Sequence, residues 1–372
     1  MPSHKFPYIE RILQQALDNG STPGIALLVE KHGTCLYRTA LGYAQIYPDH
    51  RTLTETTRFD IASLTKVVAT TTAVMLLLRD NLITLHDPVK KYVPECPHEQ
   101  ITFTHLLTHT AGFPAWQPFF EDVQQEADRR GSAEFIGSPE AKQFVLEKLC
   151  QTDLLSPPGK DCLYSDLGFI LLGVAIEHIT GVPLDQYCHD MIFQPCNMAA
   201  TGFQTTGAPV VKELYAATER CEWRQTILCG VVHDENAYAM GGVAGHAGVF
   251  STLDDLHRFM RKLLQCYQGD DPFLPQPLVR QFFARQNLVQ GSTRALGWDT
   301  PSPQKSTSGT LLSAASIGHT GFTGTSIWLD LTRQLLILLL SNRIHPSRQN
   351  QTFLNIRPKI HDTIVIATDE IS

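Results

Sequence analysis

The sequence has little that points to a membrane, a secretion signal or a nucleic-acid partner. Its longest apolar runs, residues 67–78 and 335–340, are shorter than the roughly 20 residues that a membrane-spanning helix needs. The net charge of −7 over 372 residues argues against a nucleic-acid binder. Residues 1–20 contain no apolar core of signal-peptide length and are typical of an amphipathic helix that ends at Asn19-Gly20. We therefore expect no membrane span and no nucleic-acid partner.

The cysteines show no pairing pattern. There are nine of them, and none forms a C-x-x-C pair. An odd number without paired spacing argues against a disulfide framework and against a structural zinc site. Reduced cysteines indicate a cytoplasmic protein, and a periplasmic location is the alternative if a leader peptide has been removed.

Strand-like segments lie at both ends of the sequence, and helical segments fill the middle. Since single cores rarely exceed about 250–300 residues, we expect two units. Residues 1–60 and 285–372 are predicted to form an α/β domain with a central antiparallel sheet, and residues 61–284 a mainly helical inserted domain. The predicted strands are residues 24–30, 34–39, 316–321, 325–330 and 334–342.

Between these strands the apolar residues recur with helical spacing. Residues 114–137 are polar and irregular and are predicted to be a surface excursion, whereas residues 201–229 have no clear pattern. Pro358 is expected in the first turn of the closing helix. The predicted helices are residues 1–19, 59–78, 89–92, 102–110, 139–150, 167–180, 184–193, 253–267, 278–285 and 353–367.

The predicted helix at residues 59–78 carries Ser63 and Lys66 near its start. Residues three apart share one face of a helix, so the Lys66 amine can reach the Ser63 hydroxyl. A helix N-terminus and burial both disfavour the lysine charge and would lower its pKa. One turn can then supply a nucleophile, a base and part of an oxyanion hole. The alternative is a serine near a helix start beside a solvated lysine.

Two polar groupings leave alternatives open. His105 and His109 have the i, i+4 spacing of a zinc helix, but Leu106 stands where a zinc protease has Glu, so a structural role is favoured. The segment His233-Asp234-Glu235-Asn236 is either a supporting or substrate-amine site beside a cleft, or an internally salt-bridged loop. It offers no complete metal-ligand set with familiar spacing.

Two more motifs follow Ser63-x-x-Lys66 in order, namely Tyr164-Ser165-Asp166 and His319-Thr320-Gly321. Together they resemble the S-x-x-K, Y-x-N and K-T-G or H-T-G motifs of the serine β-lactamase and penicillin-binding-protein superfamily, in its branch of class C β-lactamases, DD-carboxypeptidases and related esterases. The resemblance covers roughly residues 24–342. The segments around the motifs that share this resemblance are HDPVKKYVPE (86–95), ITFTHLLTHTAGF (101–113), PPGKDCLYSDLGFILLG (157–173) and GGVAGHAGVFSTLDDL (241–256).

The resemblance implies an α+β, β-lactamase/transpeptidase-like fold, with an antiparallel sheet flanked by helices and built from both chain termini. It implies that Ser63 forms an acyl-enzyme and that Lys66 and Tyr164 transfer protons, with the general base open between these two. It implies no cofactor and no metal. The oxyanion would be held by the backbone N–H groups of Ser63 and Phe322. The substrate-binding and oxyanion residues implied in this way are Asp166, His319, Thr320, Gly321 and Phe322.

Two departures from the family pattern bear on the activity. Asp166 stands where Asn is common, and an anion there would raise the pKa of Lys66. His319 replaces the lysine of β-lactamases and is only partly charged at neutral pH. Both weaken the case for an efficient β-lactamase.

We therefore expect a serine hydrolase that acts on the amide or ester bond of a small molecule or peptide. The expected substrates are D-amino-acid peptides, peptidoglycan fragments or small esters. The alternatives are a true class C-like β-lactamase, a catalytically weak binding protein on the same fold, and a metallohydrolase.

Overall fold

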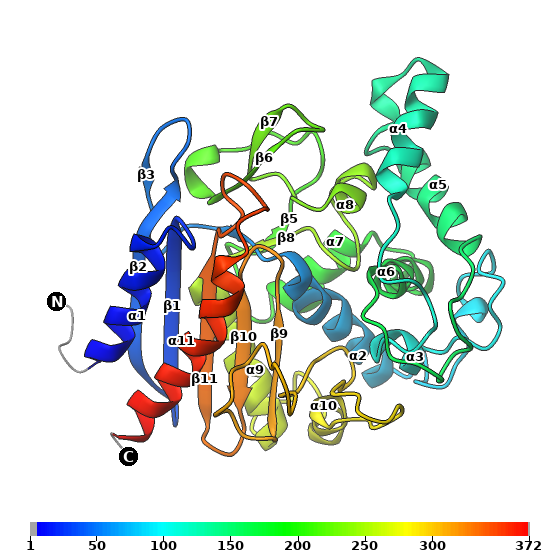
Figure 1. Cartoon of the computed structure of the whole chain (residues 1–372). Helices are drawn as coiled ribbons and strands as arrows, with labels where there is room; N and C mark the ends of the chain where they lie inside the picture. The colour runs from blue at the N-terminus through cyan, green and yellow to red at the C-terminus, as the bar shows by residue number, and fades with distance from the viewer. Residues whose placement is uncertain (1–5, 371–372) are drawn as a thin grey trace.

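The computed structural model, which describes residues 6–370, is organised around a six-stranded antiparallel sheet (Figure 1). The strand order is β3-β2-β1-β11-β10-β9, so strands from the start of the chain pair with strands from its end. This arrangement confirms the predicted α+β fold with a sheet built from both ends. The strands are β1 (Gly24–Lys31), β2 (Thr34–Gln45), β3 (Arg51–Thr52), β9 (Ser316–Thr320), β10 (Ser326–Asp330) and β11 (Leu335–Ser341).

The two central strands, β1 and β11, are buried on both faces of the sheet. Leu28 pairs with Leu338, and both point into the larger core, which α9 (Leu253–Gln268) helps to cover. The neighbouring residues along each strand point the other way, into a second core beneath α1 (Pro7–Asp18) and α11 (Thr352–Asp369). Cover on both faces explains why these strands read as continuous apolar runs rather than as alternating ones.

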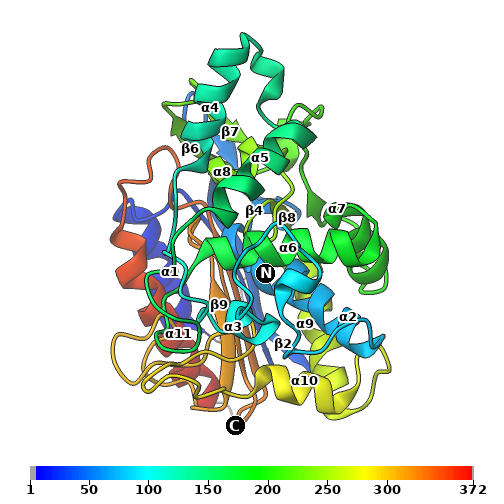
Figure 2. The ribbon, with the colours of Figure 1, turned by 90° about the vertical axis from the view of Figure 1, so that its right-hand side faces the viewer.

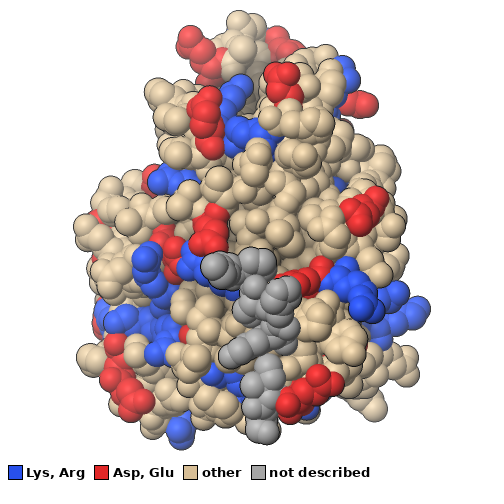
Figure 3. Space-filling model, turned by 90° about the vertical axis from the view of Figure 1, so that its left-hand side faces the viewer, with Lys and Arg blue, Asp and Glu red and all other residues tan. Residues whose placement is uncertain are grey.

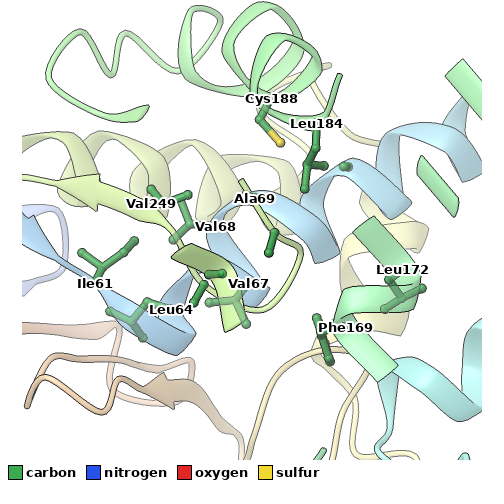
Figure 4. Packing of buried hydrophobic residues seen from close by; sticks show 14 of the residues in the cluster. Ile61, Leu64, Val67, Val68, Ala69, Phe169, Leu172, Leu184, Cys188 and Val249 are labelled. Atoms are coloured by element: carbon green, nitrogen blue, oxygen red, sulfur yellow. The ribbon is translucent and has the colours of Figure 1, made fainter. Parts of the chain in front are cut away.

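The central helical run begins at Ala62 with a 3-10 turn, η1 (Ala62–Leu64). It continues as a π-helix, η2 (Lys66–Thr71), and then as α2 (Thr72–Arg79). Its side chains pack against those of α6 (Asp166–Thr180) and of the segment around Val249 (Figure 4). The run has the length and composition of a membrane span, but 78% of it is buried inside the protein, as in a core helix. The helix α6 and the segment after it reach the length and composition of a membrane span only if the two, which are bent by 81° relative to each other, are counted as one span.

Most of the remaining helices gather on the side of the sheet that faces away from α1 and α11 (Figure 2). They are η3 (Val89–Lys91), α3 (Phe103–Leu107), α4 (Phe119–Arg130), η4 (Ala133–Phe135), α5 (Pro139–Cys150), α7 (Leu184–Cys188), η5 (His189–Phe193), η6 (Lys212–Leu214), α8 (Glu235–Ala239) and α10 (Gln276–Phe283). Two small sheets complete the fold. One contains β4 (Phe59–Asp60), β8 (Val249–Ser251) and β5 (Gly202–Phe203), and the other β6 (Ala217–Cys221) and β7 (Thr226–Cys229).

Some local predictions were wrong. Residues 114–137 contain the helix α4, whose buried side consists only of Phe119, Val123 and Ala127. Such a narrow apolar stripe in a polar sequence conceals the helical period. Pro358 lies in the interior of α11 rather than in its first turn, because the helix already begins at Thr352.

The central helix also begins later than predicted, because residues 59–60 pair with β8 as a strand. The unassigned residues 201–229 contain β5, β6 and β7. The predicted start of the first helix at residues 1–5 lies outside the described residues. The domain boundaries at residues 60 and 285 stay a prediction.

Charge on the face around α1 and β3 is mixed. Lysine and arginine side chains alternate there with aspartate and glutamate (Figure 3). A nucleic-acid-binding face would instead gather basic residues into a patch or stripe. The expectation of no nucleic-acid partner stays a prediction.

Candidate active site

Ser63 lies in the tight turn η1, between a short strand and the buried π-helix. The buried Asp60 carboxylate fixes this turn by accepting hydrogen bonds from the N–H groups of Ala62 (2.8 Å) and His233 (2.7 Å). Ala62 has φ +47°, a left-handed conformation that costs a residue with a side chain roughly 1–2 kcal/mol. Strain of this kind persists only where the surroundings enforce it, and it is concentrated at functional sites.

Lys66 is fully buried, and its ammonium group has two hydrogen-bond acceptors and one ion-pair partner. Nζ lies 3.1 Å from Ser63 Oγ, 3.0 Å from the carbonyl oxygen of His246 and 2.7 Å from Asp166 Oδ1. An ammonium group carries three donors and no acceptor, so this environment matches the charged form. The structure thus brings Ser63, Lys66 and Asp166 together.

The pKa of Lys66 reflects two opposing causes. Burial is the largest and lowers it, but the charges and hydrogen bonds of Asp166 and Tyr164 outweigh burial, so that the net pKa lies above its ordinary value of 10.5. Burial thus lowers the pKa as expected, but the expected effect of an anion at position 166 decides the net direction. A charged Lys66 cannot accept the Ser63 proton, so only the minor neutral form can act as a base.

Replacing Asp166 by Asn is expected to move the acidic limb of the pH–rate profile to lower pH. The substitution removes the anion that holds the proton on Lys66, so the neutral amine becomes populated at lower pH. The limiting rate at high pH should fall, because the amine becomes a weaker base. The measurement is kcat/KM for an activated ester against pH. Asp161→Asn, at an exposed carboxylate in the same loop, is the matched control. An unchanged profile would show that Lys66 is not the titrating base.

Tyr164 lies between two cations and two imidazole rings. Lys66 Nζ is 5.1 Å and the Arg294 guanidinium 5.2 Å from the ring centroid. The rings of His109 and His319 lie 4.5 and 5.9 Å away, centroid to centroid. Cations over an aromatic face interact with its electron density and hold the ring in place. Tyr164 is thus fixed next to the Ser63–Lys66 pair, as a proton-transfer group must be.

The two histidines with zinc-like spacing have separate structural partners. The Nδ1 of His105 accepts the Thr102 N–H (3.2 Å) and caps its own helix, whereas the Nδ1 of His109 accepts the Ser165 N–H (3.1 Å). No cluster of His, Cys, Asp or Glu among residues 6–370 could hold a metal ion. Both imidazoles therefore support neighbouring backbone, as the structural interpretation proposes.

His319, the residue before the end of β9, has a neutral side chain. Burial, with the nearby charges of Lys66 and Arg294, holds its pKa well below 6.5. Its Nδ1 lies 3.0 Å from the carbonyl oxygen of Thr320, which can only accept, so the proton is on Nδ1. The other nitrogen, Nε2, is buried and has no partner among the described residues. It is an acceptor, which suits the Tyr164 hydroxyl and not a substrate carboxylate.

Gly321 is required by the close approach of β9 to the Ser63 turn. A Cβ at this position would lie 2.6 Å from the carbonyl oxygen of Ile61 and would also collide with Thr325 Oγ1. The next residue, Phe322, has a backbone N–H that donates to no acceptor within residues 6–370. It is therefore available for the oxyanion role that the family resemblance implies.

Two cavities meet at Ser63. One, of about 390 Å³, is lined by His319, Thr320 and Gly321, and the other, of about 330 Å³, by Asp166 and residues 233–235. The side chains of Ser63, Tyr164, Phe322 and Arg348 line both cavities. A larger cavity of about 620 Å³ lies beneath α1 and contains none of the predicted site residues.

The polar cluster at residues 233–236 combines both interpretations. It lines the smaller cavity, and each charged side chain also has an internal partner. His233 bonds to Glu219 (3.0 Å), Asp234 to His246 (2.8 Å) and Glu235 to Arg348.

One of these contacts, between Asp234 and His246, connects the cluster to Lys66. Ionic and hydrogen-bonded contact with His246 holds the pKa of Asp234 well below its usual range, although burial opposes this. The carbonyl oxygen of His246 in turn accepts a hydrogen bond from the Lys66 ammonium group.

The sequence interpretation missed several of these residues. Asp60, His246 and Arg294 come from separate segments and belong to none of the three motifs. His246 had a signal, because the glycine-rich residues 240–248 were expected to approach a neighbouring element closely. No feature of the sequence pointed to Asp60 or Arg294.

A serine with a buried lysine partner, on a sheet-and-helix fold of this topology, defines a class of serine hydrolases. The chain belongs to the β-lactamase family, whose model matches residues 9–357. A relative from Salmonella heidelberg, provisionally named as a D-alanyl-D-alanine carboxypeptidase, is 32% identical over 98% of this chain and 87% of its own length. The family and its neighbours are hydrolases of the serine β-lactamase and penicillin-binding-protein type.

Solved structures show the same fold at lower identity. EstCE1, described as a hydrolase with promiscuous acyltransferase activity, superposes with a TM-score of 0.73 at 23% identity, covering 96% of this chain and 97% of that one. The LovD9 mutant of simvastatin synthase from Aspergillus terreus superposes with a TM-score of 0.73 at 18% identity, covering 98% and 99%.

Proposed function

We propose that this protein is a serine hydrolase that cleaves amide or ester bonds through an acyl-enzyme on Ser63. The observation that carries the proposal is the fully buried Lys66 ammonium 3.1 Å from Ser63 Oγ, at the point where two cavities meet. The D-alanyl-D-alanine carboxypeptidase relative and the EstCE1 neighbour support it. The proposed substrates are short D-amino-acid peptides, peptidoglycan fragments or small esters.

The proposed acylation uses the residues as follows. The neutral form of Lys66 takes the Ser63 hydroxyl proton as Oγ bonds to the carbonyl carbon, and the carbonyl electron pair moves to oxygen. The N–H groups of Ser63 and Phe322 stabilise that oxyanion, and Asp166 stabilises the ammonium. The proton then passes by way of Tyr164 to the leaving group as its bond to carbon breaks. Water then attacks the carbonyl carbon of the acyl-enzyme, the proton transfers run in reverse order, and the carboxylic acid is released from Ser63.

A true β-lactamase is the alternative within the family. β-Lactamases of this branch use a lysine at the position of His319 as a fixed cation, and here that side chain is neutral. The strand itself therefore supplies no charge for a β-lactam carboxylate.

The test is intact-protein mass spectrometry after incubation with a fluorophosphonate and, separately, with a penicillin. We expect one fluorophosphonate adduct per chain, mapping to Ser63 and absent from Ser63→Ala. A stable or slowly released penicillin adduct would show that the cleft admits β-lactams, and rapid penicillin turnover would support the β-lactamase alternative. No adduct with either probe on folded protein would refute the acyl-enzyme and favour a binding role.

A further inference from the structure

The smaller cavity beside Ser63 combines carboxylates with two exposed aromatic rings. The carboxylates and rings that line it are those of Asp166, Asp234, Glu235, Trp116 and Phe322. The rings of Trp116 and Phe322 are 44% and 47% exposed, so solvent reaches both of them. Because Ser63 lines the same cavity, a group bound there would lie next to the nucleophile.

Carboxylates outnumber fixed cations in the wall of this cavity. Its ionic contacts are Lys66–Asp166 (2.7 Å), Arg348–Glu235, Arg348–Glu219 (2.5 Å), His233–Glu219 (3.0 Å) and His246–Asp234 (2.8 Å). Arg348 is thus shared by two carboxylates, and Asp234 has no lysine or arginine partner within residues 6–370. Four carboxylates therefore meet two fixed cations, which leaves a negative surplus that a cationic ligand would neutralise.

The two carboxylates with histidine partners stay ionised at neutral pH. Burial opposes the charge of Glu219, but hydrogen bonds from His233 and Arg348 lower its pKa to about 2. Burial also opposes the charge of Asp234, whose pKa the contact with His246 holds well below its usual range. The negative surplus is therefore present at neutral pH.

The same wall contains a buried imidazole nitrogen that has no partner. His246 lines the cavity and is 1% exposed. Its Nε2 lies 2.8 Å from the Asp234 carboxylate, which can only accept, so Nε2 carries a hydrogen. Its Nδ1 is buried and has no hydrogen-bond partner within the described part of the chain. In the neutral ring Nδ1 is an acceptor, so the wall has room for a ligand that donates.

We infer that this cavity binds an ammonium group of the substrate. The inference rests on the proposed hydrolase function and specifies its substrate class, namely an amide or ester that carries a free amine. An ammonium group has three donors and no acceptor, which suits ionised carboxylates and the free nitrogen of His246. Aromatic faces attract the same group, and tryptophan does so most strongly, which gives Trp116 a role in recognition.

The test compares matched esters on the full-length protein, and within each pair an ammonium group replaces a methyl group. One pair is 4-nitrophenyl 6-aminohexanoate and 4-nitrophenyl heptanoate, with the ammonium group in the acyl part. The other is 4-(aminomethyl)phenyl acetate and 4-ethylphenyl acetate, with the ammonium group in the leaving group. In at least one pair the wild type should prefer the ammonium ester by kcat/KM.

Two variants should reduce that preference. Glu235→Gln should lower kcat/KM for the preferred ammonium ester about 10- to 100-fold, the range expected for a charged hydrogen bond. Trp116→Leu should lower it about 3- to 30-fold, as expected for a cation over an aromatic face. The Trp116 ring lies 6.3 Å from that of Phe120 and is half exposed, so the fold should be retained. For the neutral ester both variants should stay within about 2-fold of the wild type.

Three further variants separate recognition from bracing. Trp116→Phe keeps an aromatic face and should retain part of the preference. Arg348→Gln removes a fixed cation from the wall and should raise the preference, which a merely structural role would not do. Glu121→Gln, at an exposed carboxylate of α4 outside both cavities, is the matched control and should leave the ratio unchanged. An equal loss on neutral and ammonium esters in Glu235→Gln and Trp116→Leu would overturn the subsite.

The wild type alone also tests the inference. Hydrolysis of the neutral esters without a preference for the ammonium ester in either pair would overturn the subsite and leave the proposed hydrolase intact. No hydrolysis of any ester and no labelling of Ser63 would refute the hydrolase itself.

Discussion

Replacing Ser63 by Ala is expected to reduce kcat for an activated ester by roughly 10⁶-fold, to the background rate. The loss is expected to be large because the substitution removes the atom that we propose forms the acyl-enzyme, and no neighbouring group described in the site replaces it. Ser63 is only partly buried, and within residues 6–370 its hydroxyl is hydrogen-bonded to Lys66 alone, so the fold should be retained with a change in unfolding free energy within about 1 kcal/mol. The measurement is single-turnover and steady-state hydrolysis alongside thermal unfolding.

Ser347→Ala is the matched control for this experiment. Ser347 is exposed, lies outside both cavities at the site, and accepts one local hydrogen bond from the N–H of Gln349. It should hydrolyse the ester as the wild type does. Hydrolysis that survives Ser63→Ala and is lost with a chelator would establish the metallohydrolase alternative instead.

Replacing Lys66 by Met is expected to lower both activity and stability. Loss of the proton-transfer group should reduce kcat about 10²- to 10⁴-fold, in the range for general acid–base catalysis. Loss of the cation also leaves the Asp166 carboxylate, which lines the smaller cavity, without its ion-pair partner. Removing one member of a buried pair costs about 3–5 kcal/mol, and because Asp166 is partly exposed the lower end applies. Denaturant unfolding measures the second effect.

The double variant Lys66→Met/Asp166→Asn separates the two roles. Removing the orphaned carboxylate should restore most of the stability but none of the activity. The wild-type pair also has a predictable pH dependence. Because the folded pKa of Lys66 is raised above 10.5, its stabilising effect is complete below about pH 10.5 and is lost as the pH rises through the folded pKa. A double variant as unstable as Lys66→Met alone would contradict this account.

The parts of the fold that depend on local pattern could be predicted from the sequence. The apolar runs at β1 and β11 predicted strands, and the structure covers both faces of these strands with α1, α11 and α9. The three-residue spacing of Ser63 and Lys66 predicted their contact, which survives although the turn is a 3-10 helix followed by a π-helix. By contrast, the helix α4 was not predicted, because three buried residues in a polar segment give too little periodic signal.

The residues that escaped prediction in the site are those that only the tertiary fold brings there. Arg343 and Arg357 reach the larger cavity beside Ser63 from the C-terminal end of the chain, and each alone reads as an ordinary charge beside an apolar segment. Asp60 accepts a hydrogen bond from the backbone of a neighbouring residue, and a contact of this kind cannot be recognised from the residue types. Motifs report the groups that share one turn of chain, whereas the electrostatic surroundings of those groups come from distant segments.

The pairing of β1 with β11 has a consequence for how the protein is made. Residues near opposite ends of the given sequence must meet before the central sheet exists, and we expect such long-range pairing to slow folding. During synthesis β1 emerges long before its partner, with an open apolar edge that favours association with other chains or with chaperones. The strand carrying His319, Thr320 and Gly321 is also among the last to be made. The cleft beside Ser63 is therefore completed only after the ribosome has released the final strands.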